Sequence, residues 1–378
     1  GRVVCWDENL NVIWRINIAD LPVRNPRDQS VDPRIRSARL SPIGGRVLIG
    51  TAASEIFELD LEGLKSSRST DCVYKITEGH SEGEVWGLTT HPVVQHFASG
   101  GDDGHVRIWD ALSKQLISRL ALDGRVRALA YSPSGDHLAV GVHTGSLYIF
   151  DAASIQAAAV TPGEGTQTFQ VQLSHDFISV IKFSPDGQWL AVGAHDACIY
   201  LLSTSSYSRH AVLRGHHRGV SHMDFSADNT FLQSNSEAGE LFFWNIRKGV
   251  RVTATEARDV RWSSFSCVYG WPTVGVWQSQ RFSRGEGENL LTAVDQFPAL
   301  SATDRSSDSP ADLAAGDDFG RLRLFPFPAP APSFAFREYI AHSSHISSVK
   351  FTKESRFVLS TGGADRTVLQ FAYRKKAR

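Results

Sequence analysis

The sequence predicts an all-β protein in which small antiparallel sheets repeat around a ring, a β-propeller of seven blades. The first observation is an internal repeat, because Ser132–Gly141 and Ser184–Gly193 share the pattern SP-x-G-x-x-LAVG. The second is a succession of short alternating apolar runs separated by tight turns, which is typical of strands. The third is the number of repeats. Length alone would suggest two or three domains, but seven repeats of about 40–45 residues would fill about 300 of the 378 residues as one closed unit.

The clearest repeat runs from Gly79 to Asp110 and reads GHSEGEVWGLTTHPVVQHFASGGDDGHVRIWD. It opens with Gly-His, closes with Trp-Asp, and places Asp103 six residues before Trp109. These features are typical of one four-stranded blade of a WD-repeat propeller. The sequence therefore predicts a seven-bladed WD-repeat β-propeller.

Four polar residues of this repeat are expected to form a structural staple: His80, Ser99, Asp103 and Trp109. Asp103 would accept hydrogen bonds from backbone amides and from the His80 ring, which would reach the Ser99 hydroxyl and, through it, the Trp109 indole. Leaving such groups buried without partners costs about 1–3 kcal/mol each. The alternative, a hydrolase triad, is disfavoured because no Gly-x-Ser-x-Gly elbow is present and Ser99 lies inside a predicted strand.

Residues 1–33 are expected to hold a strand left from a preceding blade (1–7), a closing strand (11–18) and a polar connector rich in Pro and Asp. The chain starts without Met, inside what reads as a third strand, so we expect a piece of a longer polypeptide. Residues 34–378 are expected to form the seven repeats. The last repeat supplies three strands, and residues 11–18 would complete it, because pairing the two ends of a ring removes an exposed sheet edge.

Two of these repeats depart from the common pattern. In the fifth, Ala238 occupies the place of the turn Asp, so its staple is expected to be broken although Trp244 remains. An aromatic insertion follows near 257–279, expected as extra strand or loop at the edge of the propeller. The sixth repeat carries a segment rich in Ser, Asp and Pro near 297–310, expected as an exposed loop.

Composition argues against several classes of function. The net charge is −1, with 39 basic and 40 acidic residues, so binding of nucleic acid or of a membrane surface is not expected. Four scattered cysteines, with no CxxC pair, favour neither zinc nor a disulfide framework; they are Cys5, Cys72, Cys198 and Cys267. No apolar run is long enough to span a membrane. The pattern also lacks converging carboxylates or histidines, so neither an enzyme nor a cofactor is expected.

Several stretches go beyond the general repeat. They are EVWGLTTHP (84–92), LAVGAHDACIYLLS (190–203), LQSNSEAGELFFWNI (232–246), the insertion VRWSSFSCVYG…VGVW (260–277) and AHSSHISSVKFT (341–352). In this order they resemble the second propeller of the tandem propeller domain in the echinoderm microtubule-associated protein-like family. The resemblance implies one half of a tandem propeller, with an adjoining propeller before Gly1 and oligomerisation through an upstream coiled coil. It also implies a microtubule-associated protein of the cytoplasm and cytoskeleton, including the axoneme of cilia or flagella.

Because tubulin is acidic and this chain is nearly neutral, attachment would need locally basic or aromatic contacts. The candidates are Arg214 and Arg218 in RHAVLRGHHR, the basic terminus 374–378, and Trp271 and Trp277, which lie outside the repeats. The alternative for the basic stretch is a solvated strand followed by the usual Gly-His turn. Two other functions stay open at this point: a general WD-repeat adaptor, such as a peptide or ubiquitin-ligase substrate receptor, and an enzyme with a site in the central channel.

Overall fold

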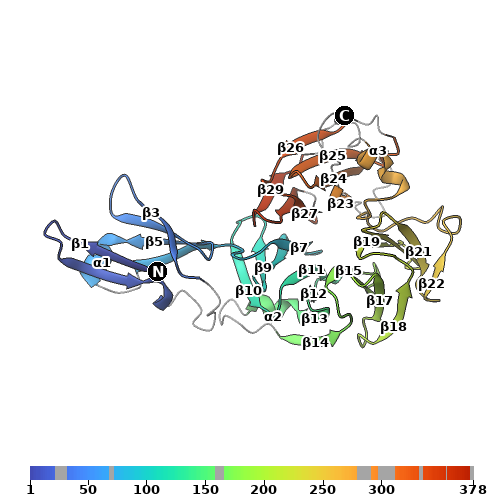
Figure 1. Cartoon of the computed structure of the whole chain (residues 1–378), viewed down its shortest axis with the longest axis horizontal. Coiled ribbons are helices and arrows are strands. Elements are labelled where there is room, and N and C mark those ends of the chain that lie inside the picture. The colour runs from blue at the N-terminus through green and yellow to red at the C-terminus, as the bar shows by residue number, and fades with distance from the viewer. Residues whose placement is uncertain are drawn as a thin grey trace. The chain divides into compact units, whose positions relative to one another are not determined.

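The computed structural model describes residues 1–21, 32–67, 72–157, 166–278, 291–296, 311–331, 335–354 and 356–374, leaving out the side chains of 67, 156, 157, 277, 278 and 311. The chain divides into two compact units, Gly1–Glu82 and Gly83–Arg378. Both consist of antiparallel sheets joined by short turns (Figure 1), which confirms the predicted all-β class.

The first unit contains one two-stranded and one four-stranded sheet. In the former, β1 (Arg2–Trp6) pairs with β2 (Val12–Asn17), and the 3-10 helix η1 (Ile18–Asp20) follows. The latter has the order β3 (Ile35–Leu40), β4 (Arg46–Thr51), β5 (Glu55–Asp60) and β6 (Val73–Glu78), with helix α1 (Leu61–Ser67) before its last strand. Apolar residues of β2 and β5 are buried in one cluster, so the two sheets share a core.

In the described residues, the second unit contains six sheets, each made of strands that follow one another in the chain. The first is β7 (Val85–Thr90), β8 (His96–Gly101), β9 (His105–Asp110) and β10 (Leu116–Ala121). The second is β11 (Val126–Tyr131), β12 (His137–Val142), β13 (Ser146–Asp151) and β14 (Gln167–Gln172), with helix α2 (Ala152–Ala157) before β14. The third is β15 (Ile178–Phe183), β16 (Trp189–Ala194), β17 (Cys198–Ser203) and β18 (Arg209–Arg214).

Of the remaining three sheets, one precedes the aromatic insertion in the chain and two follow it. The fourth is β19 (Val220–Phe225), β20 (Phe231–Ser236), β21 (Leu241–Asn245) and β22 (Val250–Val252); the 3-10 helix η3 (Trp271–Thr273) and helix α3 (Val274–Gln278) come next. The fifth is β23 (Leu291–Gln296), β24 (Ala311–Asp317), β25 (Arg321–Phe327) and β26 (Arg337–Ile340). The sixth has three strands, β27 (Ile346–Phe351), β28 (Phe357–Gly362) and β29 (Val368–Ala372).

The first strands of these sheets are the innermost ones and surround a common centre (Figure 1). β7, β11, β15 and β19 lie side by side in that order, as do β23 and β27. β27 also lies beside β7, where the Val85 amide donates to the Gly363 carbonyl at 3.2 Å and the Ser347 hydroxyl to the Val85 carbonyl at 2.5 Å. The last sheet of this unit therefore contacts the first.

Two details of the predicted organisation stay predictions. β2, expected to complete the last sheet, pairs with β1, and the last sheet has three strands among the described residues. The first repeat, β3–β6, lies in the first unit, since the chain divides at Glu82/Gly83. The count of seven blades and the boundary at 33/34 thus remain expectations. The expected exposed loop at 297–310 lies outside the described residues.

The glycine that ends each LAVG repeat sits where two neighbouring sheets come closest. A Cβ at Gly141 would lie 2.5 Å from a methyl of Ile178 on the next innermost strand, and a Cβ at Gly193 would lie 2.8 Å from Val220. Real Cβ contacts are never this short, so a side chain here would push adjacent sheets apart. The repeated glycine is therefore a packing requirement of the ring.

Candidate functional site: central cavity and basic rim

The fifth and seventh repeats show how the buried polar staple is built. In the fifth, the His216 ring contacts Glu240 Oε2 through Nδ1 at 3.0 Å and Ser234 Oγ through Nε2 at 2.7 Å, and the Trp244 indole donates to Ser234 at 2.8 Å. The prediction that this staple is broken at Ala238 is therefore wrong. Glu240 lies two residues further on, and its longer side chain reaches the ring that an aspartate would otherwise meet.

The seventh repeat has the expected acid. His342 contacts Asp365 Oδ2 at 3.0 Å and Ser360 Oγ at 2.8 Å. In the repeat that suggested the staple, the Trp109 indole donates to Ser99 at 2.9 Å, and Asp103 accepts from the backbone amide of His105 at 3.2 Å and from Arg107 at 2.8 Å. His80 belongs to the first unit and Ser99 to the second, so their link stays a prediction.

Ionisation follows from these contacts. Burial opposes the charge on Glu240, but hydrogen bonds from Ser236, His217 and His216 outweigh it and lower the pKa of this carboxyl to about 2. Burial lowers the pKa of the His216 ring, although Glu240 favours its charged form. The staple is thus an ionised carboxylate against a buried imidazole, which is a structural arrangement.

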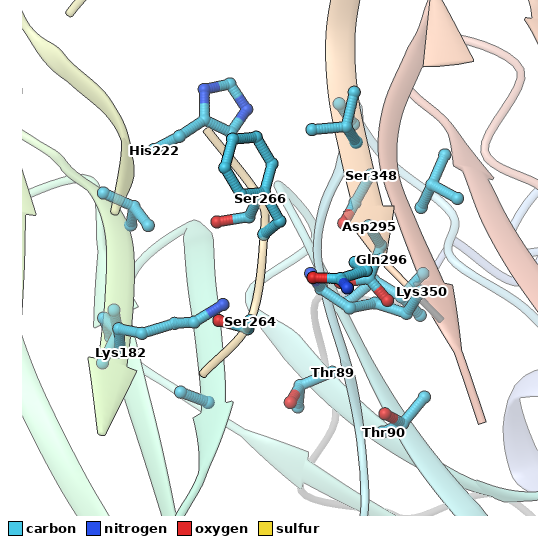
Figure 2. Close-up of a pocket in the computed structure, with 18 of the residues that line it drawn as sticks. Thr89, Thr90, Lys182, His222, Ser264, Ser266, Asp295, Gln296, Ser348 and Lys350 are labelled. Atoms are coloured by element: carbon cyan, nitrogen blue, oxygen red, sulfur yellow. The ribbon is translucent and has the colours of Figure 1, made fainter. Parts of the chain in front are cut away.

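A cavity of about 1140 Å³ lies at the centre of the second unit (Figure 2). Its wall includes the innermost strands, and the fifth residue of four of these strands is charged. Two of these are lysines and two are aspartates on adjacent strands: Lys182 lies 3.4 Å from Asp224, and Lys350 lies 2.9 Å from Asp295. Each lysine of the cavity wall therefore has a carboxylate partner.

Asp224 is fully buried and holds the aromatic insertion. Its carboxylate accepts from the backbone amides of Ser266 at 2.7 Å and Cys267 at 3.0 Å, and from the Ser264 hydroxyl at 2.6 Å. Burial raises the pKa of this carboxyl, but Lys182 and these hydrogen bonds together lower it. The carboxylate thus replaces the hydrogen-bonding partners that a neighbouring strand would supply.

The insertion was expected at the edge of the propeller, and the structure corrects this position. Ser264 and Ser266 line the central cavity (Figure 2). Further along, Val268 and Val276 share a buried cluster with Val294 of β23. The described part of the insertion therefore packs against β19 and against the sheet that begins with β23, and its first part, with Ser264 and Ser266, reaches the central cavity.

His222 connects the same two sheets from within the cavity. Its Nε2 lies 3.2 Å from the carbonyl oxygen of Thr292 on β23, and its Nδ1 lies 3.0 Å from Ser221 Oγ. Burial lowers the pKa of the ring to about 4, with Asp224 opposing the shift and Lys350 adding to it. The imidazole is therefore neutral near pH 7.

The second residue of each innermost strand of this unit lies at an irregularity of the strand register. In four sheets it is Ser or Thr, and three of these hydroxyls donate to the backbone of the next sheet, namely Ser179 to Val220, Thr292 to Ile346 and Ser347 to Val85. The other two residues are Trp86 and Arg127, and the Arg127 guanidinium lies 4.7 Å from the Trp86 ring centre. At this strand position, a cation–π pair therefore replaces the hydroxyl hydrogen bonds on one side of the cavity.

The predicted contact residues lie at the periphery. Arg214 and Arg218 are exposed, and Arg214 Nη1 lies 3.0 Å from Cys198 Sγ. Trp271 of η3 is 73% exposed, as expected for a residue outside the repeats. The side chain of Trp277 lies outside the described residues, as do residues 375–378 of the basic terminus. Their role as partner contacts stays a prediction.

The described ranges also bear on two other classes of function, metal binding and membrane insertion. No group of three or more His, Cys, Asp or Glu side chains is arranged to hold a metal ion in the part of the chain that the structure describes. Among the same residues, no helix has the length and apolar character needed to cross a bilayer.

Comparison with known proteins identifies the protein family to which this ring of sheets belongs. The profile described as "Echinoderm microtubule-associated protein second beta-propeller" matches residues 85–373, nearly the whole second unit. The chain therefore belongs to the echinoderm microtubule-associated protein family, which confirms the predicted resemblance.

Three relatives illustrate the range of similarity. The chain is 31% identical to echinoderm microtubule-associated protein-like 1 of Rattus norvegicus over 98% of its own length and 40% of the relative's. It is 29% identical to the like-4 protein of Xenopus laevis over 98% of this chain and 36% of that one, and 30% identical to the like-3 protein of Mus musculus over 87% and 34%. The chain thus spans two fifths or less of these relatives.

Proposed function

We propose that this chain is a non-catalytic, microtubule-associated scaffold that binds tubulin or other cytoskeletal and axonemal proteins through its faces and loops. The observation that supports this most strongly is membership of a family whose proteins are named for microtubule association. It follows that the protein would act in the cytoplasm on the cytoskeleton, including the ciliary axoneme.

An anchored and exposed aromatic residue supports a protein contact outside the repeats. The segment before Trp271 is held by Asp224, which accepts from two of its backbone amides. After Trp271 in the chain, the Gly275 amide donates to the Ala329 carbonyl at 2.6 Å. The 73% exposure of Trp271 leaves most of the indole in water. A large aromatic side chain on a fixed support is a typical binding hot spot, because little conformational freedom is lost on binding.

Cosedimentation with microtubules tests the proposal. The chain alone and a longer form of the protein extended at the N-terminus should be pelleted in parallel. Saturable pelleting of the chain alone would support attachment through these residues. Pelleting of the extended protein alone would assign attachment to upstream residues and leave this chain as a docking platform for other proteins.

A second candidate function is a general adaptor that holds a peptide in the central cavity. The specific observation in its favour is the replacement of hydroxyl bridges by Trp86 and Arg127 at the cavity wall. The indole Nε1 and the guanidinium Nε have no hydrogen-bond partner among the described residues. Crosslinked peptides mapping to Trp86 and Arg127, together with no microtubule pelleting, would favour this candidate over the first.

A further inference from the structure

Six exposed cations lie on the outer strands and turns of two adjacent sheets, and we call them the basic rim. They come from β18, from the turn after it, from the turn between β21 and β22, and from β22: Arg209, Arg214, Arg218, Arg247, Lys248 and Arg251. We propose that the basic rim binds an acidic peptide segment of a partner protein. This inference deepens the proposed function, on which it rests for the partner, since a scaffold for acidic tubulin would need such a surface.

The two halves of the basic rim are in direct contact. The His210 ring of β18 lies 3.3 Å from the carbonyl oxygen of Arg247. Next to it, a Cβ at Gly249 would lie 3.1 Å from the Ala211 methyl. At the other end of β18, a Cβ at Gly215 would lie 3.9 Å from Phe242, and the Arg251 guanidinium stacks on that ring at 3.5 Å. The cations therefore form one continuous surface, about 16 Å long between Arg209 and Arg214.

Carboxylates of the chain do not neutralise this surface. Among the described residues, none of the six cations has a carboxylate oxygen within 4.0 Å. The acids nearby have other hydrogen-bond partners, because Glu240 accepts from Ser236, His216 and His217, and Glu256 accepts from Thr253. Glu256 attracts Lys248 only from beyond 4.0 Å. The local field of the basic rim thus stays positive although the whole chain carries a net charge of −1.

Protection of a sheet edge is the simpler explanation for charged outer strands, but the other outer strands carry fewer unpaired cations, as β26 does with Arg337 alone. β14 carries no charged residue. On β6, Lys75 pairs with Glu78 at 2.6 Å, and on β26, Glu338 pairs with Arg323 at 2.6 Å. The six cations of the basic rim have no carboxylate partner in the described part of the chain and lie together on two neighbouring sheets. This is more positive charge than the protection of a sheet edge requires. An extended acidic segment beside β18 would meet several of them at once.

The test measures fluorescence anisotropy of a labelled peptide of alternating glutamate and glycine, with alternating glutamine and glycine as the neutral probe. The test variant combines Arg209→Glu, Arg218→Glu and Lys248→Glu, whose side chains make no contacts that the fold needs. The matched control reverses three exposed cations on other sheets and turns, Arg36→Glu, Lys114→Glu and Arg125→Glu. A third variant, Arg209→Lys with Arg218→Lys, retains the charge.

We expect the acidic peptide to bind the unaltered chain, more weakly at high salt, and the neutral probe not to bind. The test variant should weaken binding roughly tenfold or more, while the control and the lysine variant stay close to the original. Equal loss in the test and control variants, no binding by the unaltered chain, or binding of single-stranded DNA in place of the peptide would overturn the proposal. Microtubule pelleting is scored separately for the same variants and for the N-terminally extended chain, so peptide binding with no pelleting of either form would reject the proposed function and retain this inference.

Discussion

The carboxylate of Asp224 should determine whether the aromatic insertion stays in place, and this can be tested locally. Asp224→Ala leaves the backbone amides of Ser266 and Cys267 without their acceptor and Lys182 without its counter-charge. Breaking a buried, hydrogen-bonded ion pair in this way costs about 3–5 kcal/mol. Asp224→Asn should cost less, because its amide can still donate to the hydroxyl oxygens of Ser264 and Ser266 while its oxygen accepts from the backbone.

Hydrogen exchange measured by mass spectrometry is the appropriate assay, because unfolding of a chain with two compact units is not one transition. If opening of the insertion becomes about 3 kcal/mol easier, amides 263–269 should exchange about a hundredfold faster. Asp228→Ala provides the control, since this nearby aspartate is exposed and accepts from Ser226 and Thr230 in a turn. Unchanged exchange of 263–269 in Asp224→Ala would refute the role assigned to this carboxylate.

Three further predictions concern the staple, acid stability and partner binding. Ser234→Ala removes the shared partner of two buried groups, His216 Nε2 and Trp244 Nε1, and should destabilise the second unit by about 2–4 kcal/mol. Hydrogen exchange of the amides of β19 to β21, compared with the variant Ser203→Ala, measures this, and equal exchange rates in the two variants would contradict it. The pKa of His222 is about 4 in the folded chain against an ordinary 6.5, so the stability that the neutral ring contributes is present above pH 6.5 and is lost as pH falls to 4. His222→Gln should therefore flatten the pH dependence of thermal stability between pH 6.5 and 4, and an unchanged slope would count against this. The pKa of Glu240 is about 2 against an ordinary 4.5, so the stability that its ionised carboxylate contributes is present above pH 4.5 and is lost as pH falls from 4.5 to 2. Glu240→Gln should therefore make the thermal stability less sensitive to acid in this range, and an unchanged sensitivity would disprove the assignment.

The sequence predicted those features that each repeat specifies by itself. Strands at LAVG, turns at SP-x-G and a glycine against the next sheet depend on residues close together in the chain, as Gly141 and Gly193 show. The Ser–Trp pair of the staple also follows from fixed spacing, because the two residues lie on paired strands, with the serine two residues from the direct partner of the tryptophan. For this reason the family and the all-β class could be predicted without coordinates.

Contacts between sheets could not be predicted in the same way. Lys182 and Asp224 are each the fifth residue of an innermost strand, and their pairing follows only once the two strands are adjacent. The insertion does not match the repeat pattern, so the repeats gave no position for it. Its cavity-lining residues are held by Asp224, a residue of the preceding repeat. The signal that could have indicated it was a charged residue at a position that is Thr89 or Ala130 in other repeats. Glu240 was missed because the turn was expected to use an aspartate of fixed reach.

Cosedimentation with microtubules at graded tubulin concentrations tests the central claim most directly, with Trp271→Ala and the triple reversal of the basic rim beside the unaltered chain. We expect saturable pelleting of the unaltered chain that weakens at higher salt and is reduced by either variant, since both remove exposed contact residues without touching the core. Absence of pelleting both for this chain and for its N-terminally extended form would contradict the account of the protein as a microtubule-associated scaffold.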